Sequence, residues 1–190
     1  MKEKKVKLIY GLGNEGDEFK NTRHNIGKDL IDFYLKDKKN LKYSYYDYFD
    51  NLILASNRGY MNESGLGLKE LLDKFNLKTE NVLVIHDEAD IIFPYFKFSF
   101  GKKSAGHKGV DSIFKNLKTF NFWRMRIGIQ RKKRLKASFI ILDKWEKKEL
   151  ILVEKMKKAF KIILEKLRLY LPNELNLPKD YFLTIDEKIN

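Results

Sequence analysis

Residues 6–16 read VKLIYGLGNEG and carry the clearest signal of the protein's architecture. The apolar first half predicts a buried strand over residues 6–12, and the glycine-rich second half predicts a turn. The spacing also matches the G-x-G-x-x-G fingerprint of dinucleotide-binding folds. That fingerprint requires a helix that opens within the glycines, whereas here the next helical pattern begins only at Asn21 or Thr22. We therefore favour a turn whose glycines supply unusual backbone angles over a nucleotide site.

Strand-like and helix-like patterns alternate along the rest of the chain. The helical patterns place apolar residues three and four apart, and the strand-like patterns are short apolar or alternating runs. Helices are predicted at 22–35, 63–75, 110–117 and 147–168, and strands at 43–56 (a hairpin), 81–85, 95–100 and 123–129. This alternation predicts an α/β fold, with a mixed, mostly parallel twisted sheet flanked by helices on both faces.

The chain has 190 residues without a repeat, linker or low-complexity segment, which predicts a single domain over residues 1–190. From about Asn173 no clear period remains, and residues 173–190 are expected to form a loosely ordered tail. No apolar stretch is long enough to cross a bilayer, and the first apolar run is too short for a signal peptide. No heptads or long apolar surface are seen. We expect a monomeric, cytoplasmic protein without a membrane partner.

Positive charge is concentrated in one part of the chain. The formal net charge is +13, and residues 97–136 contain thirteen Lys or Arg against one acid, Asp111. Such a cluster favours a partner that carries phosphates, and a solvated lysine-rich face is the alternative. The chain has no cysteine, which excludes disulfides, thiolate metal sites and a cysteine nucleophile.

The three histidines, His24, His86 and His107, are the candidates for proton transfer near neutral pH. Hydrolysis of an ester needs a water nucleophile, a base for its proton and donors for the oxyanion, and a carboxylate such as Asp87 can orient the imidazole. Simpler readings stay open: His24 bonded to backbone at a helix start, Asp87 capping a turn, and His86 as a core residue. No two histidines have metal-ligand spacing, so no metal or other cofactor is expected.

Short polar motifs surround these histidines in a fixed order. They read GLGNEG at 11–16, TRHNIG at 22–27, YMNESG at 60–65, HDEAD at 86–90, GHKG at 106–109 and FWRMRIGI at 122–129. In this order they resemble the bacterial-type peptidyl-tRNA hydrolases over residues 6–130. The resemblance implies hydrolysis of the ester that joins a peptide to the 3′-terminal ribose of tRNA, with peptidyl-tRNA as the partner.

The same resemblance implies roles for individual residues. His24 is expected to be the general base and Asp87 its carboxylate partner. The expected substrate-binding residues are Asn14, Phe19, Met61, Asn62, His107 and Lys108. Among them the amides of Asn14 and Asn62 are implied to hold the substrate carbonyl and the activated water, although Asn62 also suits a helix N-cap.

The basic cluster is implied to bind tRNA through its backbone. Arg126 matches an arginine that grips the 5′ phosphate region, and Ser99 stands where a lysine is typical. Neighbouring lysines are therefore candidates to replace that lysine. The expected tRNA-binding residues are Lys97, Lys102, Lys103, Arg126, Arg131 and Lys133.

Three positions depart from the family's usual motifs. Glu15 replaces a proline and is expected to loosen the turn, Phe19 replaces a tyrosine and keeps its stacking surface, and Lys108 replaces an asparagine. Lys108 and Ser99 favour the main alternative, a non-catalytic RNA-binding protein on the same fold. A nucleotide-dependent enzyme that uses the glycine turn is the second alternative.

Overall fold

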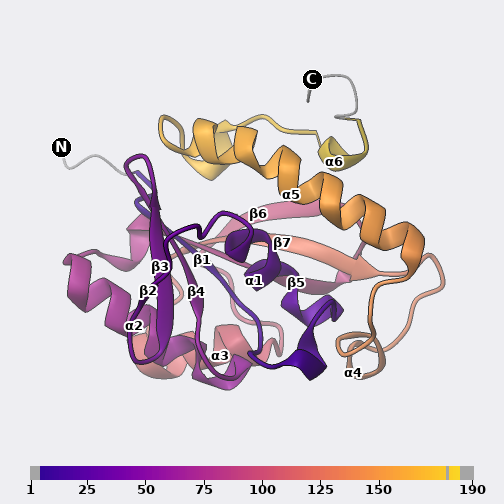
Figure 1. Ribbon diagram of the computed structural model, residues 1–190, viewed down its shortest axis with the longest axis horizontal. Coiled ribbons are helices and arrows are strands. Elements are labelled where there is room, and N and C mark those ends of the chain that lie inside the picture. The colour runs from indigo at the N-terminus through magenta and orange to yellow at the C-terminus, as the bar shows by residue number, and fades with distance from the viewer. Residues whose placement is uncertain (1–4, 179, 185–190) are drawn as a thin grey trace.

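A computed structural model describes residues 5–178 and 180–184; residues 1–4, 179 and 185–190 lie outside the description. Seven strands form one sheet in the order β2-β3-β4-β1-β5-β7-β6 (Figure 1). Parallel pairing joins β4, β1, β5 and β7 at the centre, and antiparallel pairing adds the outer strands. The strands are β1 (Leu8–Gly11), β2 (Lys39–Asn40), β3 (Ser44–Phe49), β4 (Leu52–Asn57), β5 (Val82–Ile92), β6 (Phe96–Phe100) and β7 (Trp123–Gln130).

Helices cover both faces of this sheet, as Figure 1 shows. α1 (Ile26–Asp32) and α5 (Lys147–Leu167) pack on one face, and α2 (Ser64–Phe75) and α3 (Lys108–Leu117) on the other. Side chains of a strand alternate between the faces, so Ile9 packs in the core under α1 and α5 while Leu8 and Tyr10 pack in the core under α2 and α3. The predicted α/β sheet flanked on both faces is confirmed. Among the described residues, no helix is long and apolar enough to span a membrane.

Gly11 of the first motif and Gly27 of the second allow close packing of the backbone. A Cβ at Gly11 would lie 2.3 Å from the carbonyl oxygen of Gly27, and one at Gly27 would lie 2.2 Å from that of Ile85. α1 therefore rests backbone to backbone on β1 and β5. The expected unusual backbone angle is present at Gly16, with φ 124°, but Gly11 and Gly13 do not have a positive φ.

The helix predicted over 22–35 begins later. Arg23–Asn25 form a 3₁₀ turn and α1 starts at Ile26. The backbone N–H groups of Arg23 and His24 donate to the carbonyls of Asp143 and Ile141, at 2.9 Å each. Because these donors pair with a segment far along the chain, a local pattern does not reveal where the helix begins. The same bonds hold the backbone of His24 in place.

The strand predicted over 81–85 is too short. β5 continues to Ile92, with β7 paired alongside it through Glu88. Asp87 therefore lies inside a strand, opposite Ile127, and the alternative that it caps a turn is wrong. The HDEAD motif therefore lies within β5 and not in a loop.

Part of the expected tail packs on the domain. Leu175 and Phe182 are buried, and the ring of Phe182 lies 5.1 Å from that of Phe96. This part includes the 3₁₀ turn Pro172–Glu174 and the short helix α6 (Tyr181–Thr184). A further short helix, α4 (Ala137–Ile140), precedes α5.

Candidate active site

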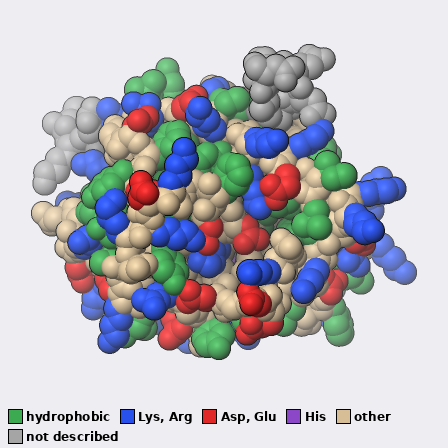
Figure 2. All heavy atoms as spheres, in the orientation of Figure 1, with side chains coloured by type: hydrophobic (Ala, Val, Ile, Leu, Met, Phe, Trp, Pro, Cys, Tyr) green, Lys and Arg blue, Asp and Glu red, His purple; other side chains and the backbone are tan. Residues whose placement is uncertain are grey.

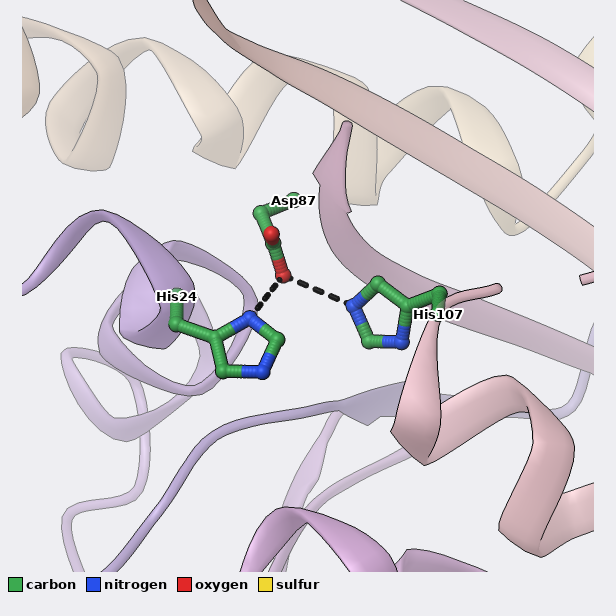
Figure 3. Close-up of side chains that lie close together, drawn as sticks. All are labelled: His24, Asp87 and His107. Carbon is green, nitrogen blue, oxygen red and sulfur yellow. Dashed lines mark hydrogen bonds and ion pairs between the residues drawn. The ribbon is translucent and has the colours of Figure 1, made fainter. Parts of the chain in front are cut away.

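Three side chains from separate elements meet at the carboxyl group of Asp87 (Figure 3). His24 comes from the 3₁₀ turn before α1, Asp87 from β5 and His107 from the residue that precedes α3. His24 Nδ1 and His107 Nε2 each lie 2.7 Å from the same oxygen, Oδ1 of Asp87. The side chains of all three are less than a tenth exposed.

The negative charge of Asp87 determines which ring nitrogen of His24 carries the proton. Burial would raise the pKa of the Asp87 carboxyl, but His107 and His24 together outweigh burial and hold that pKa well below its usual range. An ionised carboxylate only accepts hydrogen bonds, so His24 Nδ1 donates to it. In the neutral imidazole, Nε2 then carries the lone pair. This is the arrangement of a general base oriented by a carboxylate.

His107 is engaged at both ring nitrogens. Its Nδ1 accepts the backbone N–H groups of Gly109 at 3.1 Å and Val110 at 3.4 Å, so the side chain caps α3. Its Nε2 therefore carries the proton and donates to Asp87. A hydrogen bond between a ring nitrogen of His107 and the substrate would have to replace one of these bonds.

His86 lies behind this group on β5. Its Nδ1 lies 2.6 Å from the carbonyl oxygen of Asp87, and its ring packs edge-on against His107 with centroids 4.5 Å apart. Burial, followed by the proximity of His107, lowers the pKa of His86 well below its usual value, so this side chain is neutral. Its Nε2 has no partner among the described residues.

Two hollows lie beside His24 and share part of their lining, so we describe them together as one groove. They have volumes of about 240 and 340 Å³, and His24, Lys108 and Ile141 line both. The first is lined by Asp87 and Glu88 and by the loop 104–107, whereas Asn14, Tyr60, Met61, Asn62 and Leu142 line the second. The structure thus gathers five of the expected substrate-binding residues around His24: Asn14, Met61, Asn62, His107 and Lys108.

The loop that carries Asn14 is held by two side-chain amides. Asn25 accepts the backbone N–H of Asn14 at 2.8 Å and donates to its carbonyl at 2.9 Å. Asn57 holds the backbone of Gly13 in the same way, at 2.9 and 2.6 Å. Sequence reasoning missed both residues, although Asn25 lies in the TRHNIG motif. Their bonds fix the position of Asn14 beside His24.

Other residues of the motifs differ from expectation in detail. Asn62 is exposed within the 3₁₀ turn Met61–Glu63, and Glu63 precedes α2, so the alternative that Asn62 is the cap is wrong. Glu15 tightens its turn instead of loosening it, because its carboxylate accepts the Tyr45 hydroxyl and the Gly59 N–H. Phe19 packs edge-on against Tyr60, with centroids 6.3 Å apart.

One group of expected tRNA-binding residues lies on β6, β7 and the loop after β6. Lys97 on β6 lies directly opposite Arg126 on β7. The guanidinium of Arg126 is held by Glu88, with Nε at 2.9 Å and Nη2 at 2.8 Å from Oε2. Lys102 and Lys103 follow in an exposed loop whose carbonyls accept a buried guanidinium, that of Arg124. Sequence reasoning did not assign Glu88 this role.

The second group lies in the loop between β7 and α4. Arg131 forms ion pairs with Asp143 and Glu146, both at 3.4 Å, and Lys133 is exposed. Figure 2 shows Lys and Arg side chains gathered at the edge of the molecule where this loop and the start of α5 lie. The expected tRNA-binding residues therefore occupy two surfaces.

His24, Asp87 and His107 are also the group of described side chains whose donor atoms, all within 4.8 Å of one another, lie close enough to hold a metal ion. Hydrogen bonds account for this proximity, because each histidine donates an N–H to Oδ1 of Asp87. A site that works without a metal stays a prediction. An imidazole held by a carboxylate, in a groove with amides on an α/β fold, is an arrangement typical of hydrolytic enzymes.

The peptidyl-tRNA hydrolase family model matches residues 8–178. The chain therefore belongs to the peptidyl-tRNA hydrolase family. It is 35% identical over 163 residues to the peptidyl-tRNA hydrolase of Mycoplasma mycoides subsp. mycoides SC, covering 78% of this chain and 85% of the relative. It is 37% identical over 138 residues to that of Aquifex aeolicus, covering 68% and 72%.

A solved structure gives the same assignment. The crystal structure of peptidyl-tRNA hydrolase from Acinetobacter baumannii aligns with a TM-score of 0.69 at 26% identity, covering 85% of this chain and 89% of that one. These likenesses give no support to a non-catalytic RNA-binding protein. The nucleotide alternative also loses its basis, because the glycine loop leads into the acidic 3₁₀ turn Asp17–Phe19 rather than into the start of a helix that would bind a pyrophosphate.

Proposed function

We propose that this protein hydrolyses the ester bond between the peptide and the 3′-terminal ribose of peptidyl-tRNA, with His24 as the general base. The observation that carries this proposal is the 2.7 Å bond from His24 Nδ1 to the ionised carboxylate of Asp87 beside the groove. This bond leaves His24 Nε2 to act on a water molecule. Family membership supplies the substrate class.

The reaction then follows from the position of the base. His24 Nε2 takes a proton from water, and the water oxygen attacks the ester carbonyl carbon to form a tetrahedral oxyanion. When the intermediate collapses, the bond to the ribose 3′ oxygen breaks, and that oxygen takes the proton back from the imidazolium. Asp87 stabilises the positive charge on His24 between these two proton transfers.

Side chains of the groove are proposed to hold the ester. Asn14 Oδ1 accepts the Met61 N–H at 2.7 Å, so the amide NH₂ of Asn14 is the group left to donate to a substrate carbonyl. Asn62 is exposed in the same hollow and suits the attacking water. Lys108 lines both hollows and offers a cationic donor where an asparagine is typical. Phe19, packed on Tyr60, extends the wall of the groove.

The tRNA is proposed to lie across the basic residues. Lys97 and Arg126, paired across two strands, present two cations side by side, and Lys102 and Lys103 extend this surface. The loop with Arg131 and Lys133 is proposed to bind another stretch of the RNA backbone. Contacts with phosphates suit a substrate whose sequence varies. We place the reaction in the cytoplasm, where translation takes place, and a monomeric state stays a prediction.

Arg126→Ala tests the binding surface. Because Arg126 neutralises Glu88, which lines the first hollow, we compare the double variant Glu88→Gln/Arg126→Ala with Glu88→Gln alone, so that no carboxylate is left unpaired in either protein. We expect KM for peptidyl-tRNA to rise and the slope of log K against log salt to fall by about one, while a short nucleotide ester is cleaved normally. Lys69→Ala, which removes an exposed lysine of α2, is the charge-matched control. An equal loss on both substrates would mean that Arg126 does not act through tRNA.

A further inference from the structure

We propose that His107 is a positioning residue that acts through Asp87, tying the start of α3 to the carboxylate that orients His24. This inference rests on the proposed role of His24 and adds a residue to it. A single oxygen atom of Asp87 accepts two hydrogen bonds: the N–H groups of both His24 and His107 donate to Oδ1, at 2.7 Å each.

The start of α3 fixes the tautomer of His107. Two backbone N–H groups, those of Gly109 and Val110, point at its Nδ1, so this nitrogen accepts and the proton stays on Nε2. Protonation of Nδ1 would turn one acceptor into a donor facing two donors. The Nε2–H of His107 is thereby directed at Asp87. The helix start acts as a rigid support for the carboxylate.

The hydrogen bond that His107 donates to Asp87 affects how Asp87 orients His24. It fixes the rotation of the carboxyl group, so that Oδ1 remains in line with His24 Nδ1. His107 thus keeps the base oriented.

The other groups around His107 leave this effect intact. His86 of β5 packs edge-on against its ring and is buried and neutral. His24 faces it from the turn before α1, with ring centroids 5.1 Å apart. Asp87 of β5 is the charged group bonded to it, and Arg124 of β7 acts on the neighbouring His86. The exposed Lys108 follows it in the chain.

The variant His107→Asn should keep one of the two interactions of this side chain, the cap of α3, and remove the other, the hydrogen bond to Asp87. Asparagine is a favoured helix cap but is too short to reach Asp87, so α3 keeps its cap while the carboxylate loses its second donor. We expect kcat on peptidyl-tRNA to fall about tenfold to a hundredfold with KM nearly unchanged. A lower kcat at an unchanged KM separates this loss from a general disturbance of the groove, which would raise KM. Asp111→Asn, which alters the first turn of α3 without touching Asp87, is the control, with kcat and KM unchanged.

Nitrogen-15 NMR of the wild-type imidazoles supplies a second test that needs no variant. Couplings to the ring protons should show the proton on Nε2 of His107 and on Nδ1 of His24 at neutral pH. A proton on His107 Nδ1, or an unchanged kcat in His107→Asn, would overturn the positioning role. Failure of the wild-type protein to release peptide would instead refute the proposed function.

Discussion

Asp87→Asn removes one negative charge from the site while keeping its shape. The amide oxygen of the new side chain can take the place of Oδ1 and accept both N–H bonds, because neither histidine offers an acceptor there. The tautomers of His24 and His107 are then unchanged. The variant therefore isolates the charge of the carboxylate from its geometry.

The expected loss follows from the distance between the charges. An imidazolium at His24 bonded at 2.7 Å to the carboxylate of Asp87 has its charge centre about 4 Å away. At an effective dielectric constant of about 20, this attraction is worth about 4 kcal/mol. Since about 1.4 kcal/mol corresponds to a factor of ten, kcat should fall by about a thousandfold. KM should change little, because Asp87 is buried and acts through His24.

The assay is release of labelled peptide from peptidyl-tRNA at neutral pH, under single-turnover and steady-state conditions. Asp73→Asn, which removes an exposed carboxylate from α2, is the control for a lost charge elsewhere. Circular dichroism would check that the variant is folded. A folded Asp87→Asn protein with turnover within about fivefold of wild type would refute the reasoning, because the base would then not depend on the carboxylate.

Two further substitutions test the fold that carries the site. Burial raises the pKa of Asp29 on α1 to about 7, so between about pH 4 and pH 7 the folded state keeps a proton that the unfolded state has lost, and stability falls as pH rises. Asp29→Asn should remove that dependence and raise the free energy of unfolding at pH 8 by up to about 4 kcal/mol, measured by urea denaturation; an unchanged dependence on pH would contradict this. Gly27→Ala would place a methyl group 2.2 Å from the carbonyl oxygen of Ile85, so the free energy of unfolding should fall by about 1–3 kcal/mol and turnover should fall as α1 shifts. A wild-type melting temperature for Gly27→Ala would show that α1 and β5 are not in close contact.

Local patterns sufficed for much of the fold. The apolar run of β1 is buried throughout and the amphipathic helix α2 buries one periodic face, so these sequences indicate their structure directly. The hairpin of β3 and β4 also lies within the range predicted for it. The site candidates were also found from the sequence, since His24, Asp87 and His107 lie in the ordered motifs, and the structure brings them within hydrogen-bonding distance.

Some features depend on tertiary contacts and could not be predicted from the sequence. α1 begins at Ile26 because the preceding N–H groups bond to carbonyls of Ile141 and Asp143. β5 extends past Ile85 because β7 pairs alongside it and buries polar residues that usually mark a strand end. Asn57 holds the backbone of the glycine loop without belonging to any motif. None of these contacts depends on a periodic pattern of residues, so none could be predicted from such a pattern.

The most direct measurement compares wild type and His24→Ala in peptide release from peptidyl-tRNA, with tRNA affinity measured on the same preparations. We expect multiple turnovers by the wild type, and in the variant a kcat lower by a factor of about 10² to 10⁴ with affinity for tRNA within about twofold. Equal turnover by both proteins would contradict a base at His24, and tight binding without release by the wild type would contradict the enzyme itself.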